Sequence, residues 1–197
     1  MLNLLKTSFP KARWITDRLT REILLFSELG KYRIATLVSL TNAVGYVANP
    51  HAELTSTLIF STAGVYLTAS SAAHLNQILE RRQDSLMHRT KNRPLVINKC
   101  SVRRAAFHAL ISGCVGLAIM WLKTNPVATG LAGFNIVLYA FIYTPLKQIT
   151  PFNTEIGSIV GALPPLIGWT SAALDCCELG YEAMILPGNS ITRAIST

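Results

Sequence analysis

Charged residues are scarce in this 197-residue chain, at 14% of the total, whereas typical soluble proteins carry about 25%. Acids are the scarcer sign, with 10 Asp and Glu against 18 Lys and Arg, so the formal charge is +8. Hydrophobic residues make up 50% of the chain, and the mean hydropathy is +0.37. The composition argues against an ordinary soluble domain. No nucleic-acid partner is expected either, because the Lys and Arg residues do not follow one solvated face.

Cysteine is also rare, and its spacing argues against a zinc site. The four residues are Cys100, Cys114, Cys176 and Cys177, and none forms a CxxC pair. Two adjacent cysteines are poorly spaced to bind one tetrahedral metal together. We therefore expect free thiols that are mostly buried.

A long leucine-rich run is absent, but five moderately apolar segments recur at near-even spacing. They cover about residues 34–48, 54–79, 105–122, 127–145 and 156–174. A bilayer span needs roughly 20 residues, and the small residues in these segments allow helices to pack closely in lipid. The sequence predicts an all-α fold, a polytopic transmembrane helix bundle of about five spans.

The basic residues alternate between the ends of these segments. Seven Lys and Arg lie in residues 1–33 and eight in residues 80–104, whereas residues 49–53 have none. The remaining connections contain only Lys123 and Lys147. By the positive-inside rule, the N-terminus and the 80–104 loop lie on the same side of the membrane.

The N-terminal segment, residues 1–30, is basic and has no acid before Asp17. It lacks the continuous apolar core of a secretory signal. The composition fits a mitochondrial targeting segment or a basic cytoplasmic tail, and we favour the first.

Three oxygen-bearing side chains stand one helical turn apart where the second segment ends. Asn76, Glu80 and Asp84 are spaced i, i+4, i+8, which places them on one stripe of a helix. Mg²⁺ accepts one or two carboxylates and completes its shell with water and substrate phosphate oxygens. Arg89, Lys91 and Arg93 would be suitable donors for such phosphates. From the spacing alone, a solvated loop with capping acids explains the same residues equally well.

A second polar group, "YTPLK" at residues 143–147, is expected on the same side of the membrane. Pro145 is expected to end the fourth helix. Tyr143 offers a hydroxyl, and Lys147 could reach a phosphate. By themselves these two residues would be read as an interfacial tyrosine and a snorkelling lysine.

Two long stretches resemble one known family. "NQILERRQDSLMHRTKNRPLV" (76–96) and "GLAGFNIVLYAFIYTPLKQITPFNTEIGSIVGALPPLIGWTSAA" (130–173) are similar to the protohaem IX farnesyltransferases (haem O synthases). Those enzymes belong to the UbiA-type intramembrane prenyltransferase superfamily. The resemblance extends from about Lys31 to Ser171, and it implies an all-helical membrane fold that normally has about nine helices.

The resemblance also implies an activity and its residues. The activity is transfer of a farnesyl group from farnesyl diphosphate to a vinyl group of protohaem IX (haem b), which gives haem O for haem A biosynthesis. It implies a magnesium site and assigns the residues as follows: Asn76, Glu80 and Asp84 to the metal and to catalysis, Tyr143 and Lys147 to catalysis, and Lys31, Arg89, Lys91, Arg93 and Lys147 to the diphosphate. The form of the "RTKNRPLV" run resembles the mitochondrial members, so the mitochondrial inner membrane is the expected location.

The resemblance fades after about residue 175, where a second acidic motif would be expected. We therefore divide the chain into residues 1–30, a prenyltransferase region at 31–175 and a divergent tail at 176–197, and expect a truncated form. Two alternatives stay open, namely a related prenyltransferase with a quinone-type acceptor and an inactive membrane fragment. Glycines at 130, 133, 157 and 161 could make room for a prenyl chain or merely allow close packing. A homo-oligomer is also compatible with the sequence.

Overall fold

The computed structural model describes residues 20, 22–50, 52, 55–147, 150 and 152–185, with side chains as far as Ala172. A short helical stretch at 22–29 comes first. The later elements are α2 (Tyr32–Val47), α3 (Ser56–Leu79), α4 (Arg81–Leu86), α5 (Val102–Lys123), α6 (Pro126–Val137), the π-helix η1 (Leu138–Tyr143), α7 (Thr144–Leu146) and α8 (Asn153–Ile185). The predicted all-α transmembrane fold is confirmed. Residues 1–19 and 21 of the proposed targeting segment (1–30) and residues 186–197 of the tail (176–197) lie outside the described residues.

In the described residues, α6, η1 and α7 follow one another without a break and form one long helical segment. Together with α2, α3, α5 and α8, this segment occupies the five predicted positions. Within the described residues, Val102–Lys123 and Pro126–Leu146 are long and apolar enough to cross a membrane by those criteria alone. α3 is less apolar because it buries hydroxyl groups inside the bundle, including those of Ser61, Thr68 and Ser71. Intramembrane polar groups of this kind are expected to face protein and not lipid.

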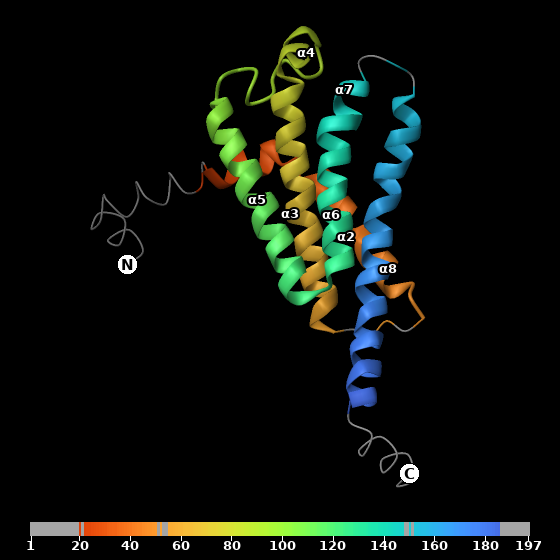
Figure 1. Ribbon diagram of the computed structural model, residues 1–197. Coiled ribbons are helices and arrows are strands. Elements are labelled where there is room, and N and C mark those ends of the chain that lie inside the picture. Colours follow the sequence, from red (N-terminus) through yellow and green to blue (C-terminus); the bar gives the residue numbers. More distant parts are fainter. Residues whose placement is uncertain are drawn as a thin grey trace, which may run out of the picture.

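The helices stand side by side, with α3 packed against both α2 and α5 (Figure 1). α8 packs against α2 and α6. The 80–101 loop and the end of α7 lie at one end of the bundle, while the α2–α3 and α5–α6 connections lie at the other (Figure 1). The predicted alternation between ends rich and poor in Lys and Arg is therefore present in the fold.

Two glycines allow α2 and α8 to cross in backbone contact. A Cβ atom at Gly168 would overlap the carbonyl of Asn42, and one at Gly45 would overlap the carbonyl of Pro165. Asn42 is fully buried beside this crossing, and its side chain donates to the Ser61 hydroxyl of α3 at 3.1 Å. Small residues thus set the α2–α8 distance, as is common between helices in lipid.

Asparagine side chains attach α8 to the opposite end of the bundle. Asn49 donates to the carbonyl of Trp169 at 3.1 Å, and Asn125 donates to the carbonyl of Thr170 at 3.0 Å. The two donors follow α2 and precede α6, so both neighbours of α8 are tied to the same turn. These bonds fix the position of α8 along its axis relative to α2 and α6. That position matters because earlier turns of α8 border the cavity described below.

The prediction that Pro145 ends the fourth helix is wrong, since the chain stays helical to Leu146. In the preceding π-helix, the Thr144 N–H pairs with the Tyr139 carbonyl five residues back. The Lys147 N–H then bonds the Tyr143 carbonyl at 3.0 Å. Pro145, which has no N–H, falls between these two bonds and is accommodated.

The cysteine prediction is right for one of the two described thiols. Cys100 and Cys114 are both free, but only Cys100 is buried. Cys114 is on the outer face of α5, which meets lipid and therefore tolerates a thiol as a small apolar group. Cys176 and Cys177 lie outside the described side chains.

We predict that Gly168→Ala destabilises the bundle by about 1–3 kcal/mol, because the added methyl group forces α2 and α8 apart. Unfolding by SDS titration in mixed micelles would measure it. Gly130→Ala is the matched control, since nothing lies within 4 Å of a Cβ there. Equal stability of the two variants would show that the α2–α8 crossing does not limit stability.

Candidate functional site

The three predicted oxygen donors come together in a buried stripe at one end of the bundle. Asn76 lies in the last turns of α3, Glu80 at the junction with α4, and Asp84 within α4. The Glu80 N–H bonds the Asn76 carbonyl at 2.9 Å, and the Asp84 N–H bonds the Glu80 carbonyl at 2.8 Å. Helical spacing therefore persists across the α3–α4 junction. The residues are only 3%, 6% and 3% exposed, respectively.

Three cations from separate segments meet this stripe. Lys31 donates to the side-chain oxygen of Asn76 at 2.7 Å. Arg93 lies between both acids, with an ion pair to Asp84 and a 3.6 Å approach to Glu80. The Lys147 Nζ is 3.5 Å from the other carboxylate oxygen of Glu80. Two buried carboxylates need such compensation, since an unpaired buried charge costs several kcal/mol.

Lys31 is held in place by its backbone and by α3. Its φ of 48° lies in the left-handed region, which is uncommon for residues other than glycine. Gln77 of α3 donates to the carbonyls of Glu28 and Leu29, at 3.3 and 2.9 Å. Burial, together with the positive charge of Arg93, lowers the pKa of Lys31 to about 8. The ammonium group is therefore poorly solvated and directed at the stripe.

The loop after α4 positions Arg93. Thr90 is buried, and its hydroxyl donates to the Asp84 carbonyl at 3.1 Å. Leu95 is inserted into a small apolar cluster with Leu29 and Cys100. Arg93 lies between these two anchor points, so the loop returns it to the stripe.

The other two predicted phosphate donors are elsewhere. Arg89 and Lys91 are exposed, and neither side chain has a hydrogen bond or ion pair with the described part of the chain. They lie in the turns between Leu86 and Arg93, on the outer side of the loop. Their assignment to the diphosphate stays a prediction that these contacts do not support.

Tyr143 stacks on Tyr139, with ring centroids 5.5 Å apart and an angle of 24° between the planes. Gly157 of α8 lies against the Tyr143 ring, since a Cβ there would be 3.1 Å from it. Tyr143 is half-buried but does not line the main cavity, whereas Tyr139 does. The tyrosine closest to the cavity is therefore one that the sequence analysis did not select.

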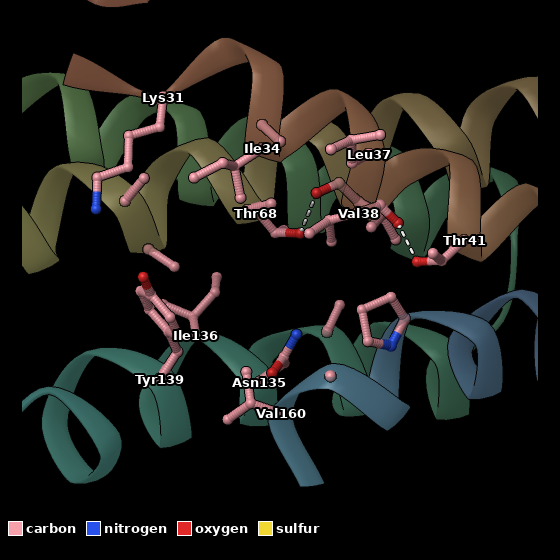
Figure 2. A pocket seen from close by; sticks show the side chains of 18 of the residues that line it. Lys31, Ile34, Leu37, Val38, Thr41, Thr68, Asn135, Ile136, Tyr139 and Val160 are labelled. Atoms are coloured by element: carbon pink, nitrogen blue, oxygen red, sulfur yellow. Dashed lines mark hydrogen bonds between the residues drawn. The ribbon is translucent and has the colours of Figure 1, made fainter. Parts of the chain in front are cut away.

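An apolar cavity of about 260 Å³ opens next to the stripe, between α2, α3, α6, η1 and α8. Figure 2 shows Lys31 and Tyr139 at one end of it, with Ile34 and Leu37 along one wall and Ile136 along the other. Lys31 also contacts Asn76, so this residue belongs to both the cavity and the stripe.

The four glycines suggested for a prenyl site separate into two groups. Only Gly161 lines the cavity, and a Cβ there would meet nothing within 4 Å. Gly130, Gly133 and Gly157 do not line it. Gly157 packs against Tyr143, and Gly133 lies beside Leu117, whereas a Cβ at Gly130 would meet nothing within 4 Å.

The donor set fits a magnesium–diphosphate group. Among the described residues, no three His, Cys, Asp or Glu side chains gather in a cluster that could hold a metal ion by themselves. Mg²⁺ needs only one or two carboxylates when phosphate oxygens and water supply its other ligands. Glu80 and Asp84 are hard oxygen donors on one stripe, and the three nearby cations would bind the phosphate oxygens.

Comparison with known proteins identifies the family. Residues 35–187 match the model of the UbiA prenyltransferase family. The chain belongs to the UbiA prenyltransferase family.

Curated relatives extend well beyond the matched region. "Protoheme IX farnesyltransferase, mitochondrial" of Arabidopsis thaliana is 44% identical over 162 residues, which are 81% of this chain and 37% of that protein. The human protein of the same name is 39% identical over 148 residues, 75% of this chain and 33% of its own length. "Protoheme IX farnesyltransferase 1" of Shewanella sp. (strain ANA-3) is 40% identical, over 74% of this chain and 49% of that protein. The chain thus spans between a third and a half of these relatives.

A solved structure supports the fold independently. The structure of digeranylgeranylglyceryl phosphate synthase in membranes has a TM-score of 0.68 and covers 75% of this chain and 52% of that chain. At 18% sequence identity, the likeness concerns the fold alone.

Sequence reasoning missed Tyr139, Thr144 and Asn135. Tyr139 and Asn135 are polar residues four positions apart within a strongly apolar segment, and both line the cavity. That i, i+4 spacing was a readable signal of a shared helical face. Thr144 gave no such signal, because its contact with Asn76 depends on how α3 and the π-helix pack.

We predict that Arg93→Met destabilises the protein by roughly 3–5 kcal/mol, because it leaves two buried carboxylates without their shared partner. SDS titration in mixed micelles would measure the loss. Arg89→Met removes an equal charge from an exposed site in the same loop and should be nearly neutral. A similar loss in both variants would mean that the loop's general charge matters and not the Arg93 contacts.

Proposed function

We propose that this chain forms the diphosphate-binding part of a protohaem IX farnesyltransferase. The reaction would transfer a farnesyl group from farnesyl diphosphate to a vinyl group of haem b, giving haem O on the route to haem A. The names of the relatives and the resemblance at residues 76–96 support this assignment. The observation that carries it is the position of Lys31, which contacts the oxygen-donor stripe and also lines the apolar cavity.

This junction of stripe and cavity suits a prenyl diphosphate, which has a highly charged head and an apolar tail. The head would bind to Lys31, Arg93 and Lys147 beside the acids of the stripe. The tail would enter the cavity, whose walls are mostly aliphatic. A metal ion held by Glu80 and Asp84, with the oxygen of Asn76, would supply Lewis-acid stabilisation of charge on the diphosphate.

The cationic side chains would contribute mainly in the transition state. Negative charge grows on the diphosphate as the carbon–oxygen bond breaks, and positioned donors then bind it more strongly. Before substrate arrives, Arg93 and Lys147 are paired with Glu80 and Asp84. The apolar cavity would keep water away from the reactive carbon until the acceptor attacks.

The membrane location follows from the fold, and we propose the mitochondrial inner membrane. The Arabidopsis and human relatives carry a mitochondrial designation, and the N-terminal segment has the basic composition of a targeting sequence. Haem b and farnesyl diphosphate are both partly apolar, so each can reach the site from the bilayer.

Haem O formation in cells that lack their own haem O synthase tests the assignment. The chain would be expressed by itself and also in place of the matching segment of the Arabidopsis relative. We expect haem O from the exchanged protein and its loss, by at least 100-fold, on Asp84→Asn. The control, Arg82→Gln, changes an exposed residue of the same helix. An exchanged protein that folds, binds farnesyl diphosphate and makes no haem O would refute the acceptor assignment.

Cavity size gives a second prediction. Gly161→Phe should raise the KM for farnesyl diphosphate about tenfold or more and affect the shorter geranyl diphosphate less, because the new ring fills space meant for the tail. Gly130→Phe is the matched control, as that position is also unobstructed but lies outside the cavity. Equal KM values for both variants would place the tail elsewhere.

A further inference from the structure

We propose that the aromatic ring of Tyr139 stabilises the allylic cation formed when a prenyl diphosphate ionises in this site. The inference rests on the proposed function, since it requires the diphosphate at the stripe and the prenyl chain in the cavity. It assigns a catalytic role to a side chain outside the oxygen-donor stripe.

Tyr139 is positioned where the apolar cavity meets the oxygen-donor stripe. It lines the cavity at the same end as Lys31 (Figure 2), and Lys31 in turn contacts Asn76 of the stripe. With the diphosphate bound to Lys31 and Arg93, the first carbon of the prenyl chain must lie at this boundary. Among the described residues, Tyr139 is the only aromatic one that lines the cavity.

The π-helix connects Tyr139 directly to the stripe. The Thr144 hydroxyl donates to the Tyr139 carbonyl at 2.8 Å, and the Asn76 amide donates to the same hydroxyl at 3.1 Å. Thr144 is 1% exposed, so this bridge is sealed from solvent. The five-residue reach from Tyr139 to Thr144 needs the wide π-helical turn, and such turns often occur at functional sites.

Tyr143 fixes the orientation of the ring. It stacks on one side of the Tyr139 ring and does not itself line the cavity, whereas Tyr139 does. A ring packed in this way loses little freedom when a cation forms beside it. This preorganisation is what electrostatic stabilisation of a transient charge requires.

The chemical step is heterolytic cleavage of the bond between the first prenyl carbon and the diphosphate oxygen. Both bonding electrons leave with the diphosphate, where Lys31, Arg93 and Lys147 stabilise the added negative charge. The positive charge is shared between the first and third carbons of the allylic group. The negative face of an aromatic ring attracts such a charge, whereas the aliphatic side chains lining the cavity do not.

Binding of cation mimics to the full chain in lipid nanodiscs tests this role without turnover. The probes are farnesyl dimethylammonium and its neutral isopropyl isostere, each titrated with Mg²⁺ and inorganic diphosphate. We expect the wild-type chain to bind the cation more tightly, and Tyr139→Leu to reduce that preference roughly 30-fold. Tyr139→Phe should retain it, because the ring and not the hydroxyl is responsible. Phe141→Leu, an exposed position in the same π-helix, should also retain it.

A fluorination series separates electrostatics from shape. Phenylalanine with one, two and three ring fluorines at position 139 keeps the ring's size while weakening its negative face, so the preference for the cation should fall stepwise. A flat series, with both probes still bound, would overturn the role of Tyr139 and leave the proposed function intact. Failure of the wild-type chain to bind either probe with magnesium diphosphate would instead refute the proposed function itself.

Discussion

The arrangement of this bundle end depends on neutralising two buried carboxylates. Glu80 and Asp84 are almost inaccessible, and their charges are compensated by Arg93 and Lys147, while Lys31 binds the adjacent Asn76. A lone carboxylate in this environment would cost several kcal/mol. The loop after α4, the start of α2 and the end of α7 must therefore approach α3 together, although they are far apart in the sequence.

The apolar cavity, the second part of the site, depends on close packing of α8 against its neighbours. Glycines at the α2–α8 crossing bring two backbones into contact, and asparagines at the opposite end fix the height of α8. With α8 held, Val160, Gly161 and Pro164 stand against α2 and α6 as a cavity wall. The apolar cavity thus results from helix packing, whereas the charged stripe results from helical periodicity. Lys31 joins the two.

The positions of the helices and of the oxygen-donor stripe were predictable, because both depend on patterns within short segments of the sequence. Apolar length predicted the five long segments, and the i, i+4, i+8 spacing of Asn76, Glu80 and Asp84 survives because α4 continues the hydrogen bonding of α3. The basic residues were less predictable. Arg93 reaches the stripe while Arg89 and Lys91 face outward, because the buried Thr90 and Leu95 determine how the loop turns.

The sequence by itself determined the fold class, the family and the stripe, because these depend on periodicity, composition and a contiguous motif. Only the tertiary structure decided which cations approach the acids and which tyrosine borders the cavity. The π-helical turn at residues 138–143 shifts the helix register, placing Tyr139 on the cavity and Tyr143 behind it. The contacts of this turn come from α3 and α8, since Asn76 donates to Thr144 and Gly157 lies against Tyr143, and no local pattern around Tyr139 encodes these partners.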